Sequence, residues 1–79
     1  MNHHMATNST ELLMTIETER EDDGRWLAEV IEINGALAYG ATRAAAIANA
    51  QALALRVLAE RLEQGEEVPD LRGVFSVAA

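Results

Sequence analysis

The segment GALAYGATRAAAIANA, Gly35 to Ala50, decides the fold that we expect for this chain. It opens with a short apolar run between two glycines, passes through Thr42, and continues into a stretch made mostly of alanine. Alanine has the highest helix propensity, glycine permits a change of chain direction, and threonine can accept a hydrogen bond from a backbone N–H one turn into a helix. The segment therefore predicts a strand, a turn at Gly40 and a helix capped by Thr42.

Upstream of this segment, the sequence predicts two more strands. Alternation of apolar and polar residues, typical of a half-buried strand, begins at Glu11 and returns after residue 25. The side chains expected on the buried face are Leu12, Met14 and Ile16 in the first strand and Trp26, Ala28 and Val30 in the second. Between these strands, the pair Asp23-Gly24 is a strong hairpin signal. A turn at Asn34-Gly35 then leads into the third strand, Ala36 to Tyr39, which completes an antiparallel meander.

Downstream, the predicted helix runs from Arg43 to about Gln64, because Gly65 is a typical stop signal and Pro69 follows soon after. A last strand, Leu71 to Ala78, is expected to close the chain. The order βββαβ indicates an α+β fold, in which one long helix covers one face of an antiparallel sheet. We expect a disordered leader over residues 1–10 and a single domain over residues 11–79.

The small size of the chain limits the stability that such a domain can reach alone. The chain has 79 residues, no cysteine, and two histidines that both lie in the leader. The core of so small a domain supplies only about 3–5 kcal/mol of net stability. Disulfides and thiolate metal sites are excluded by the lack of cysteine, so a partner chain is the remaining source of stability. We therefore expect a homo-oligomer or an obligate complex.

Charge indicates the kind of partner. Thirteen acidic and six basic residues, all of the latter arginine, give a formal net charge of −7. Such a chain repels nucleic acid and attracts basic proteins, so we expect no direct binding of DNA or RNA. No apolar run approaches the roughly 20 residues that span a membrane, and the leader does not resemble a signal peptide. We expect a cytoplasmic protein without membrane contact.

The helix has more apolar surface than one sheet requires. Its polar residues fall in a narrow stripe, and the residues expected to cover the sheet are Ile47, Ala50, Ala54, Val57 and Leu58. The residues on the flank beyond them, which we predict to form a subunit interface, are Ala44, Ala48, Leu55 and Leu62. The competing interpretation is that alanine is simply a good helix former that costs little when it is exposed.

Catalytic side chains are scarce, so we expect no enzyme activity, no cofactor and no metal. The chain has no cysteine, and no histidine outside the leader can activate Ser76 as a base. Carboxylates on adjacent strands, Glu17 and Glu29, are the remaining candidates for a metal-dependent nuclease, although outward-pointing glutamates usually serve only solubility. Trp26 and Tyr39 could form a ligand-stacking pair, but the alternation favours Trp26 as a core residue.

The ordered part of the chain, from Leu12 to about Pro69, resembles the HicB-like antitoxin family of toxin–antitoxin systems. The family pattern joins an acidic residue and glycine, an aromatic residue, alternating Ala and Val, two spaced glycines, an Ala/Asn-rich helix start and a Val-Pro pair after the helix. The residues that carry it here are Asp23, Gly24, Trp26, Ala28, Val30, Gly35, Gly40, Thr42, Ala46, Asn49, Ala50, Val68 and Pro69.

The chain departs from the pattern at several positions. Ile31 and Asn34 stand where the family favours proline, and Ala36 where it favours cysteine. Ala44 and Ala45 replace an acidic pair, so that no capping box forms with Thr42. Family members often continue into a DNA-binding segment, and none follows the last strand expected here. The resemblance therefore indicates a divergent or orphan bacterial member without DNA binding.

This resemblance implies a noncatalytic antitoxin core. Such a core would neutralise a basic, RNA-cleaving toxin of the HicA type by occluding its RNA-binding surface. Charge alone suggests the residues that would contact the toxin: Glu29, Glu32, Glu66 and Glu67. An alternative is an orphan self-associating interaction module without a toxin. A third alternative is a degenerate RNase H-like nuclease that uses Glu17 and Glu29.

Overall fold

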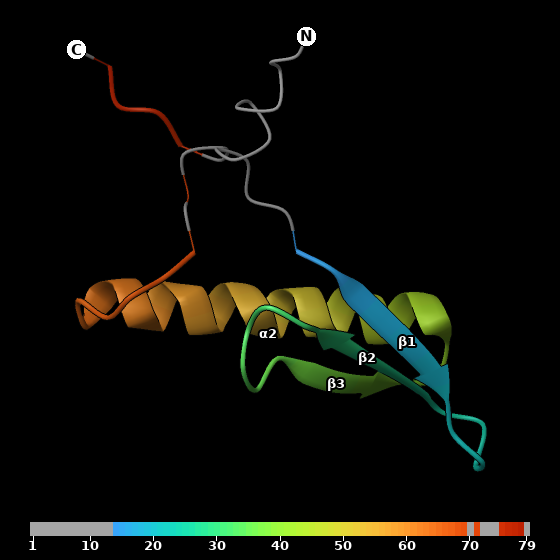
Figure 1. Ribbon diagram of the computed structural model, residues 1–79. Coiled ribbons are helices and arrows are strands. Elements are labelled where there is room, and N and C mark those ends of the chain that lie inside the picture. The colour runs from blue at the N-terminus through green and yellow to red at the C-terminus, as the bar shows by residue number, and fades with distance from the viewer. Residues whose placement is uncertain (1–13, 70, 72–74, 79) are drawn as a thin grey trace, which may run out of the picture.

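The computed structural model describes residues 14–69, 71 and 75–78. Its elements are β1 (Ile16–Arg20), β2 (Trp26–Val30), β3 (Leu37–Gly40) and α2 (Arg43–Glu63). The strands form an antiparallel sheet in the order β1-β2-β3, and the long helix packs against one face (Figure 1). The expected α+β class and the order βββα are confirmed.

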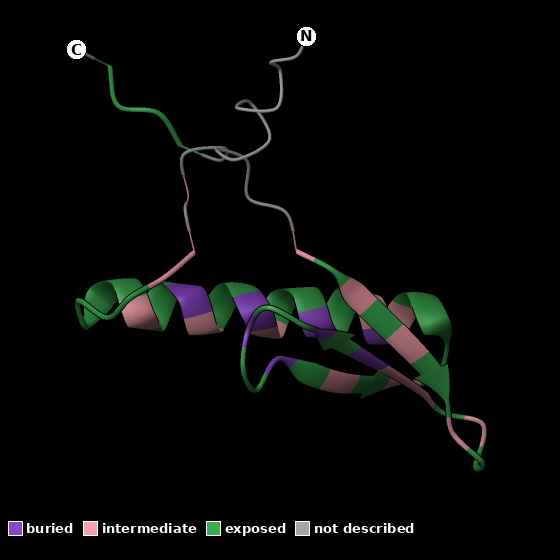
Figure 2. Cartoon of the chain, viewed as in Figure 1, coloured by how far each residue is buried: buried purple, intermediate pink, exposed green. Residues whose placement is uncertain are grey.

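The core lies between α2 and the face of the sheet that carries Ala28 and Val30. Figure 2 shows the buried residues along the helix side that faces the strands and in the connection from β2 to β3. The buried residues are Ala28, Val30, Ile33, Ala36, Ala46, Ala50, Ala54 and Leu58. Five of these eight are alanine, so the helix lies close to the sheet and the buried apolar volume is small.

Alternation predicted the buried strand face correctly. Ala28 and Val30 are fully buried, and Ile16 and Trp26 are half-buried against the same core. Residues with odd numbers in β1 and β2 point to the opposite side, which agrees with the exposure of Glu17, Glu19 and Glu29. The sheet therefore has one packed face and one face that points away from the helix.

Both expected turns are present, and each has glycine at a positive φ. The β1–β2 connection is a three-residue hairpin loop in which Glu21 N–H donates to the Arg25 carbonyl at 2.7 Å, and Gly24 has φ 91°. In the β2–β3 connection, Ile33 N–H donates to the Val30 carbonyl at 3.2 Å, and Gly35 has φ 88°. These glycines adopt a backbone conformation that other residues rarely enter.

The helix boundaries follow from side-chain and backbone caps. Thr42 has extended φ and ψ, and its Oγ1 accepts a hydrogen bond from Ala45 N–H at 3.0 Å. At the other end, Gly65 has φ 73°, and Glu66 N–H donates to the Arg61 carbonyl at 2.8 Å. Together with the bond from Gly65 N–H to the Leu62 carbonyl, this is a Schellman motif, which satisfies the last carbonyls of a helix.

We expect Thr42→Ala to lower the free energy of unfolding by about 1 kcal/mol, because the Ala45 N–H loses its acceptor. The measurement is the urea midpoint at neutral pH. Thr42→Ser retains a hydroxyl and should keep most of the stability. If Thr42→Ala unfolds at the parent midpoint, the cap does not contribute.

Gly40 forms the junction between β3 and the helix. A Cβ at this position would meet backbone atoms of Ala45 and Ala46, among them Ala46 Cα at 2.9 Å. Real Cβ atoms do not approach so closely, and helix backbone cannot give way as a side chain end does. Gly40 is therefore required by close approach and not by a positive φ.

The expected closing strand is not formed by the described residues of Leu71 to Ala78. Phe75 N–H donates to the Leu71 carbonyl at 2.8 Å, and none of the described residues in this range belongs to a strand. Phe75 and Val77 are exposed, so the alternation of this segment covers no apolar surface. The expected leader, residues 1–10, and the start of the first strand at Glu11 lie outside the described residues.

Candidate interaction surfaces

The first candidate surface is the side of the sheet that points away from α2. We call it the outer face and define it by Glu17, Glu19, Leu27, Glu29, Leu37 and Tyr39. Strand register places Leu27 in its centre, between Glu19 on β1 and Tyr39 on β3. Leu37 and Tyr39 are each 42% exposed, and no other described element covers them. The outer face thus combines an apolar centre with an acidic side.

Electrostatics on the outer face are unbalanced. Glu17 lies directly opposite Glu29, and like charges in that position repel each other. The ion pair found among the described residues joins Arg25 Nε to Asp23 Oδ2 at 2.8 Å, and it does not involve these glutamates. A shallow depression of about 100 Å³ lies between Glu17, Glu19 and Glu29 beside Leu27. Its size and charge suit the end of a basic side chain.

Arg25 supplies positive charge at the hairpin end of the outer face, but it is already engaged. Its guanidinium lies 4.3 Å from the centroid of the Tyr39 ring, a cation–π distance. Asp23 accepts from both the backbone N–H and Nε of Arg25. The backbone hydrogen bond from Arg25 is the main cause that lowers the pKa of Asp23 below its ordinary value. Arg25 therefore orders the tip and does not neutralise the three glutamates.

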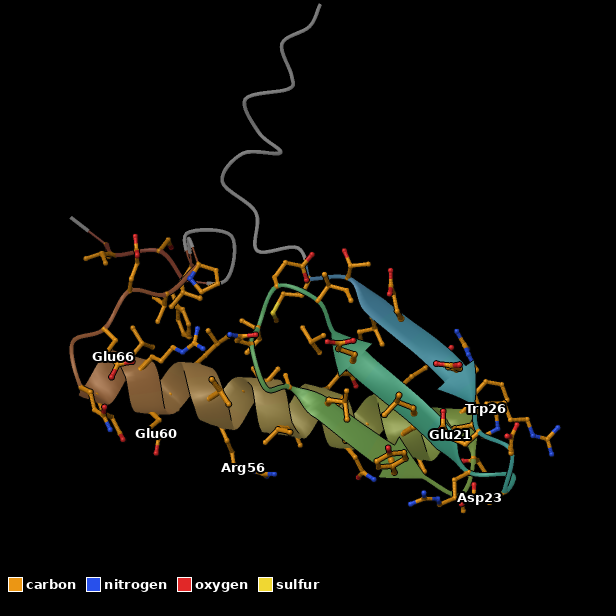
Figure 3. All side chains as sticks on the ribbon, turned by 60° about the horizontal axis from the view of Figure 1, so that its bottom comes forward. Glu21, Asp23, Trp26, Arg56, Glu60 and Glu66 are labelled. Atoms are coloured by element: carbon orange, nitrogen blue, oxygen red, sulfur yellow. The ribbon has the colours of Figure 1, made fainter. Side chains whose placement is uncertain are left out.

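The four glutamates expected to contact a partner do not form one surface. Glu29 belongs to the outer face, whereas Glu32 lies in the β2–β3 turn and its Oε1 accepts from Thr15 N–H at 2.7 Å. That hydrogen bond lowers the pKa of Glu32. Glu66 and Glu67 follow α2, and Figure 3 shows Glu66 at the end of the domain opposite to Asp23. In the strand register, Glu17 lies opposite Glu29, so Glu17 belongs to the same surface as Glu29.

The disfavoured interpretation, in which Trp26 and Tyr39 form a ligand-stacking pair, is wrong. In the register of β2 and β3, Trp26 lies opposite Gly40 and Leu27 lies opposite Tyr39. Adjacent residues of a strand point to opposite faces, so the two aromatic rings lie on different sides of the sheet. Trp26 packs against the core, as the favoured interpretation stated. Within the described residues, no three His, Asp or Glu side chains converge as a metal site would require.

The second candidate surface is the exposed flank of α2. The residues predicted for a subunit interface, Ala44, Ala48, Leu55 and Leu62, are all exposed. Leu55 is 61% exposed and borders an apolar groove of about 460 Å³ between the helix and the start of β1. The groove is lined by Met14, Ile16, Val30, Gln51, Ala54 and Leu55. The flank and the groove are continuous, because Leu55 belongs to both.

No protein-family model, no curated protein and no solved structure matches this chain. Among the described helices, none combines the length and the apolar character that a membrane crossing demands.

Proposed function

We propose that this chain is a noncatalytic protein-binding module, the core of a HicB-like antitoxin. It would neutralise a basic, RNA-cleaving toxin of the HicA type by covering the toxin's RNA-binding surface. The observation that carries the proposal is the outer face, in which half-exposed Leu27, Leu37 and Tyr39 lie beside three carboxylates without a basic partner among the described residues.

This composition fits a basic protein partner. An interface gains most of its affinity from a buried apolar or aromatic centre, which Tyr39 and the two leucines can supply. Glu17, Glu19 and Glu29 would face the arginine and lysine side chains with which a toxin holds RNA phosphates. A net charge of −7 would also accelerate the encounter with a cationic protein. The mechanism is occlusion, because the toxin cannot contact this face and RNA at the same time.

A second candidate function is an orphan module that associates with itself and has no toxin. The observation that favours it is the flank of α2, where Leu55 and Leu62 are exposed without a charged neighbour on the same helix face. The two candidates use different sides of the domain, so separate variants can test them.

The test of the antitoxin proposal is binding of a HicA-type toxin to the full chain, together with inhibition of its RNA cleavage. We expect the double variant Glu17→Lys/Glu29→Lys to weaken binding at least about tenfold, a loss of about 1.4 kcal/mol. The like-charge pair persists in this variant, so the sheet itself should be little affected. The cleavage assay should show a matching loss of inhibition.

Glu66→Lys/Glu67→Lys is the matched control, because it makes the same charge change on exposed residues beyond the helix. This control should bind the toxin within about threefold of the parent, since the general attraction changes but the contact does not. Equal losses in both double variants would show that only net charge matters. A parent chain that neither binds the toxin nor inhibits cleavage contradicts the proposal.

A further inference from the structure

The turn between β2 and β3 places an asparagine directly before a glycine. Ala36 N–H donates to the Ile33 carbonyl at 3.1 Å, so Asn34 and Gly35 are the two central residues of a β-turn. Gly35 has φ 88°, which the second central residue of a type II turn requires. Both residues are exposed, and a Cβ built on Gly35 would meet nothing within 4 Å apart from its chain neighbours. The pair therefore lies in open space.

An exposed Asn-Gly pair carries the reactants for loss of the side-chain amide. The backbone nitrogen of Gly35 forms a bond to Asn34 Cγ, the bond from Cγ to the side-chain nitrogen breaks, and ammonia leaves with the proton of the Gly35 N–H. The resulting succinimide ring is opened by water at either carbonyl, which gives aspartate or isoaspartate. Glycine favours this ring closure because it has no side chain to crowd the attacking nitrogen. Among the described residues, neither the Asn34 amide nor the Gly35 N–H has a hydrogen-bond partner that would restrain it.

Two similar side chains in the same domain are restrained. Asp23 also precedes a glycine at positive φ, but its oxygens accept from the backbone N–H of Arg25 at 3.0 Å and from Arg25 Nε at 2.8 Å. These hydrogen bonds hold the pKa of Asp23 below its ordinary value, and an ionised carboxylate resists attack by nitrogen. Asn49 lies within α2, and its Nδ2 donates to the Tyr39 carbonyl at 2.8 Å. Asn34 differs from both because its side chain is free to turn toward the next nitrogen.

We propose that Asn34 is a site of spontaneous deamidation in the folded chain, and that the isoaspartyl product loosens the domain. Isoaspartate carries the main chain through its side-chain carbon, which inserts an extra atom between positions 34 and 35. The lengthened turn would hold two core residues, because Ile33 and Ala36 are each 1% exposed. Val30 N–H also donates to the Ala36 carbonyl at 2.9 Å, so the change would reach the end of β2. The reaction consumes only water and is independent of any partner.

The experiment is incubation of the full chain in mildly alkaline buffer, which favours removal of the Gly35 N–H proton, followed by mass spectrometry of its peptides. Circular dichroism verifies that the chain stays folded. Asn34 should be converted at least about tenfold faster than Asn49, which corresponds to a barrier lower by about 1.4 kcal/mol. Asn34→Gln should remove the reaction at this position, because its ring would need one more atom. Equal conversion of Asn34 and Asn49 overturns the proposal.

A parallel incubation in urea shows whether the folded turn itself permits the reaction. Conversion of Asn34 in the folded chain should stay within about tenfold of its rate in urea, a barrier difference of at most about 1.4 kcal/mol. A slower reaction than this would show that the turn protects the pair and that the unfolded fraction of the chain supplies the product. That result overturns the proposal, even if Asn34 still reacts faster than Asn49.

The effect on stability is tested with the separated product. Ion exchange isolates the deamidated chain, because loss of the amide leaves an additional negative charge, and an isoaspartyl methyltransferase identifies the isoaspartyl fraction. This fraction should unfold at a lower urea concentration than the parent. Asn34→Asp is the matched control, because it adds the same charge without lengthening the backbone, and it should keep the parent midpoint. An isoaspartyl fraction as stable as Asn34→Asp would show that the turn absorbs the extra atom, which overturns this part of the proposal.

Discussion

Replacing Gly40 with alanine should unfold much of the protein at room temperature. The added methyl would collide with helix backbone at Ala45 and Ala46, and neither a rotamer change nor a side-chain shift can remove that collision. Either β3 or the first turn of α2 must move, which would disrupt the close approach of Gly40 to the helix backbone. Overpacking typically costs about 1–3 kcal/mol, and a backbone collision lies at or above the top of that range. A small domain has only about 3–5 kcal/mol to lose.

Gly65→Ala is the control for this experiment. Gly65 has open space around its Cβ position and a φ of 73°, so alanine there should cost about 1 kcal/mol through backbone strain alone. Urea unfolding followed by circular dichroism measures both variants. A Gly40→Ala protein as stable as Gly65→Ala would show that β3 and α2 are farther apart than the structure has them.

Replacing Ala50 with leucine should be the second most damaging single change. Ala50 is fully buried against the sheet, in a row with Ala46, Ala54 and Leu58 at intervals of four residues. A larger side chain at this position must push the helix away from the strands. The Asn49 hydrogen bond and the close approach at Gly40 both need the helix and β3 to lie close together. We expect a loss of about 1–3 kcal/mol, the usual cost of inserting methylene groups into a packed core.

The same substitution at Ala52, two residues along the helix and exposed, provides the comparison. Alanine and leucine have similar helix propensities, so Ala52→Leu should leave the urea midpoint nearly unchanged. If both variants unfold at the parent midpoint, the contact between α2 and the sheet is loose enough to absorb a leucine. Such a result would contradict a core built on alanine.

Local signals were sufficient to predict most of the fold. Alternation predicted the faces of β1 and β2, Asp23-Gly24 predicted the hairpin, and Thr42 predicted the start of the helix, because each depends on neighbouring residues alone. Ile33 was not predicted as a core residue for the same reason. Its position is in phase with Glu29, so a continuing strand would have exposed it, but the strand ends at Val30 and the turn directs Ile33 inward.

Contacts between distant segments were harder to predict. The hydrogen bond from Thr15 N–H to Glu32 engages a carboxylate that charge alone suggested was available to a partner. The segment expected to form the last strand has a suitable alternation, but the sequence does not show with which strand it would pair. The sequence placed Glu17 and Glu29 on adjacent strands, and the strand register adds that they lie directly opposite each other, with Glu19 and Leu27 beside them. The set of glutamates that share one surface therefore depends on how the strands pair.

The amide of Asn49 has a consequence for how far assembly can proceed. A sheet that offers strands at both margins can add subunits without limit and grow into a filament. In this protein, the hydrogen bond from Asn49 to the Tyr39 carbonyl occupies one of the outward-pointing backbone groups of β3. A strand that paired with β3 would have to displace the Asn49 amide, so growth along this margin would cost a hydrogen bond that is already made.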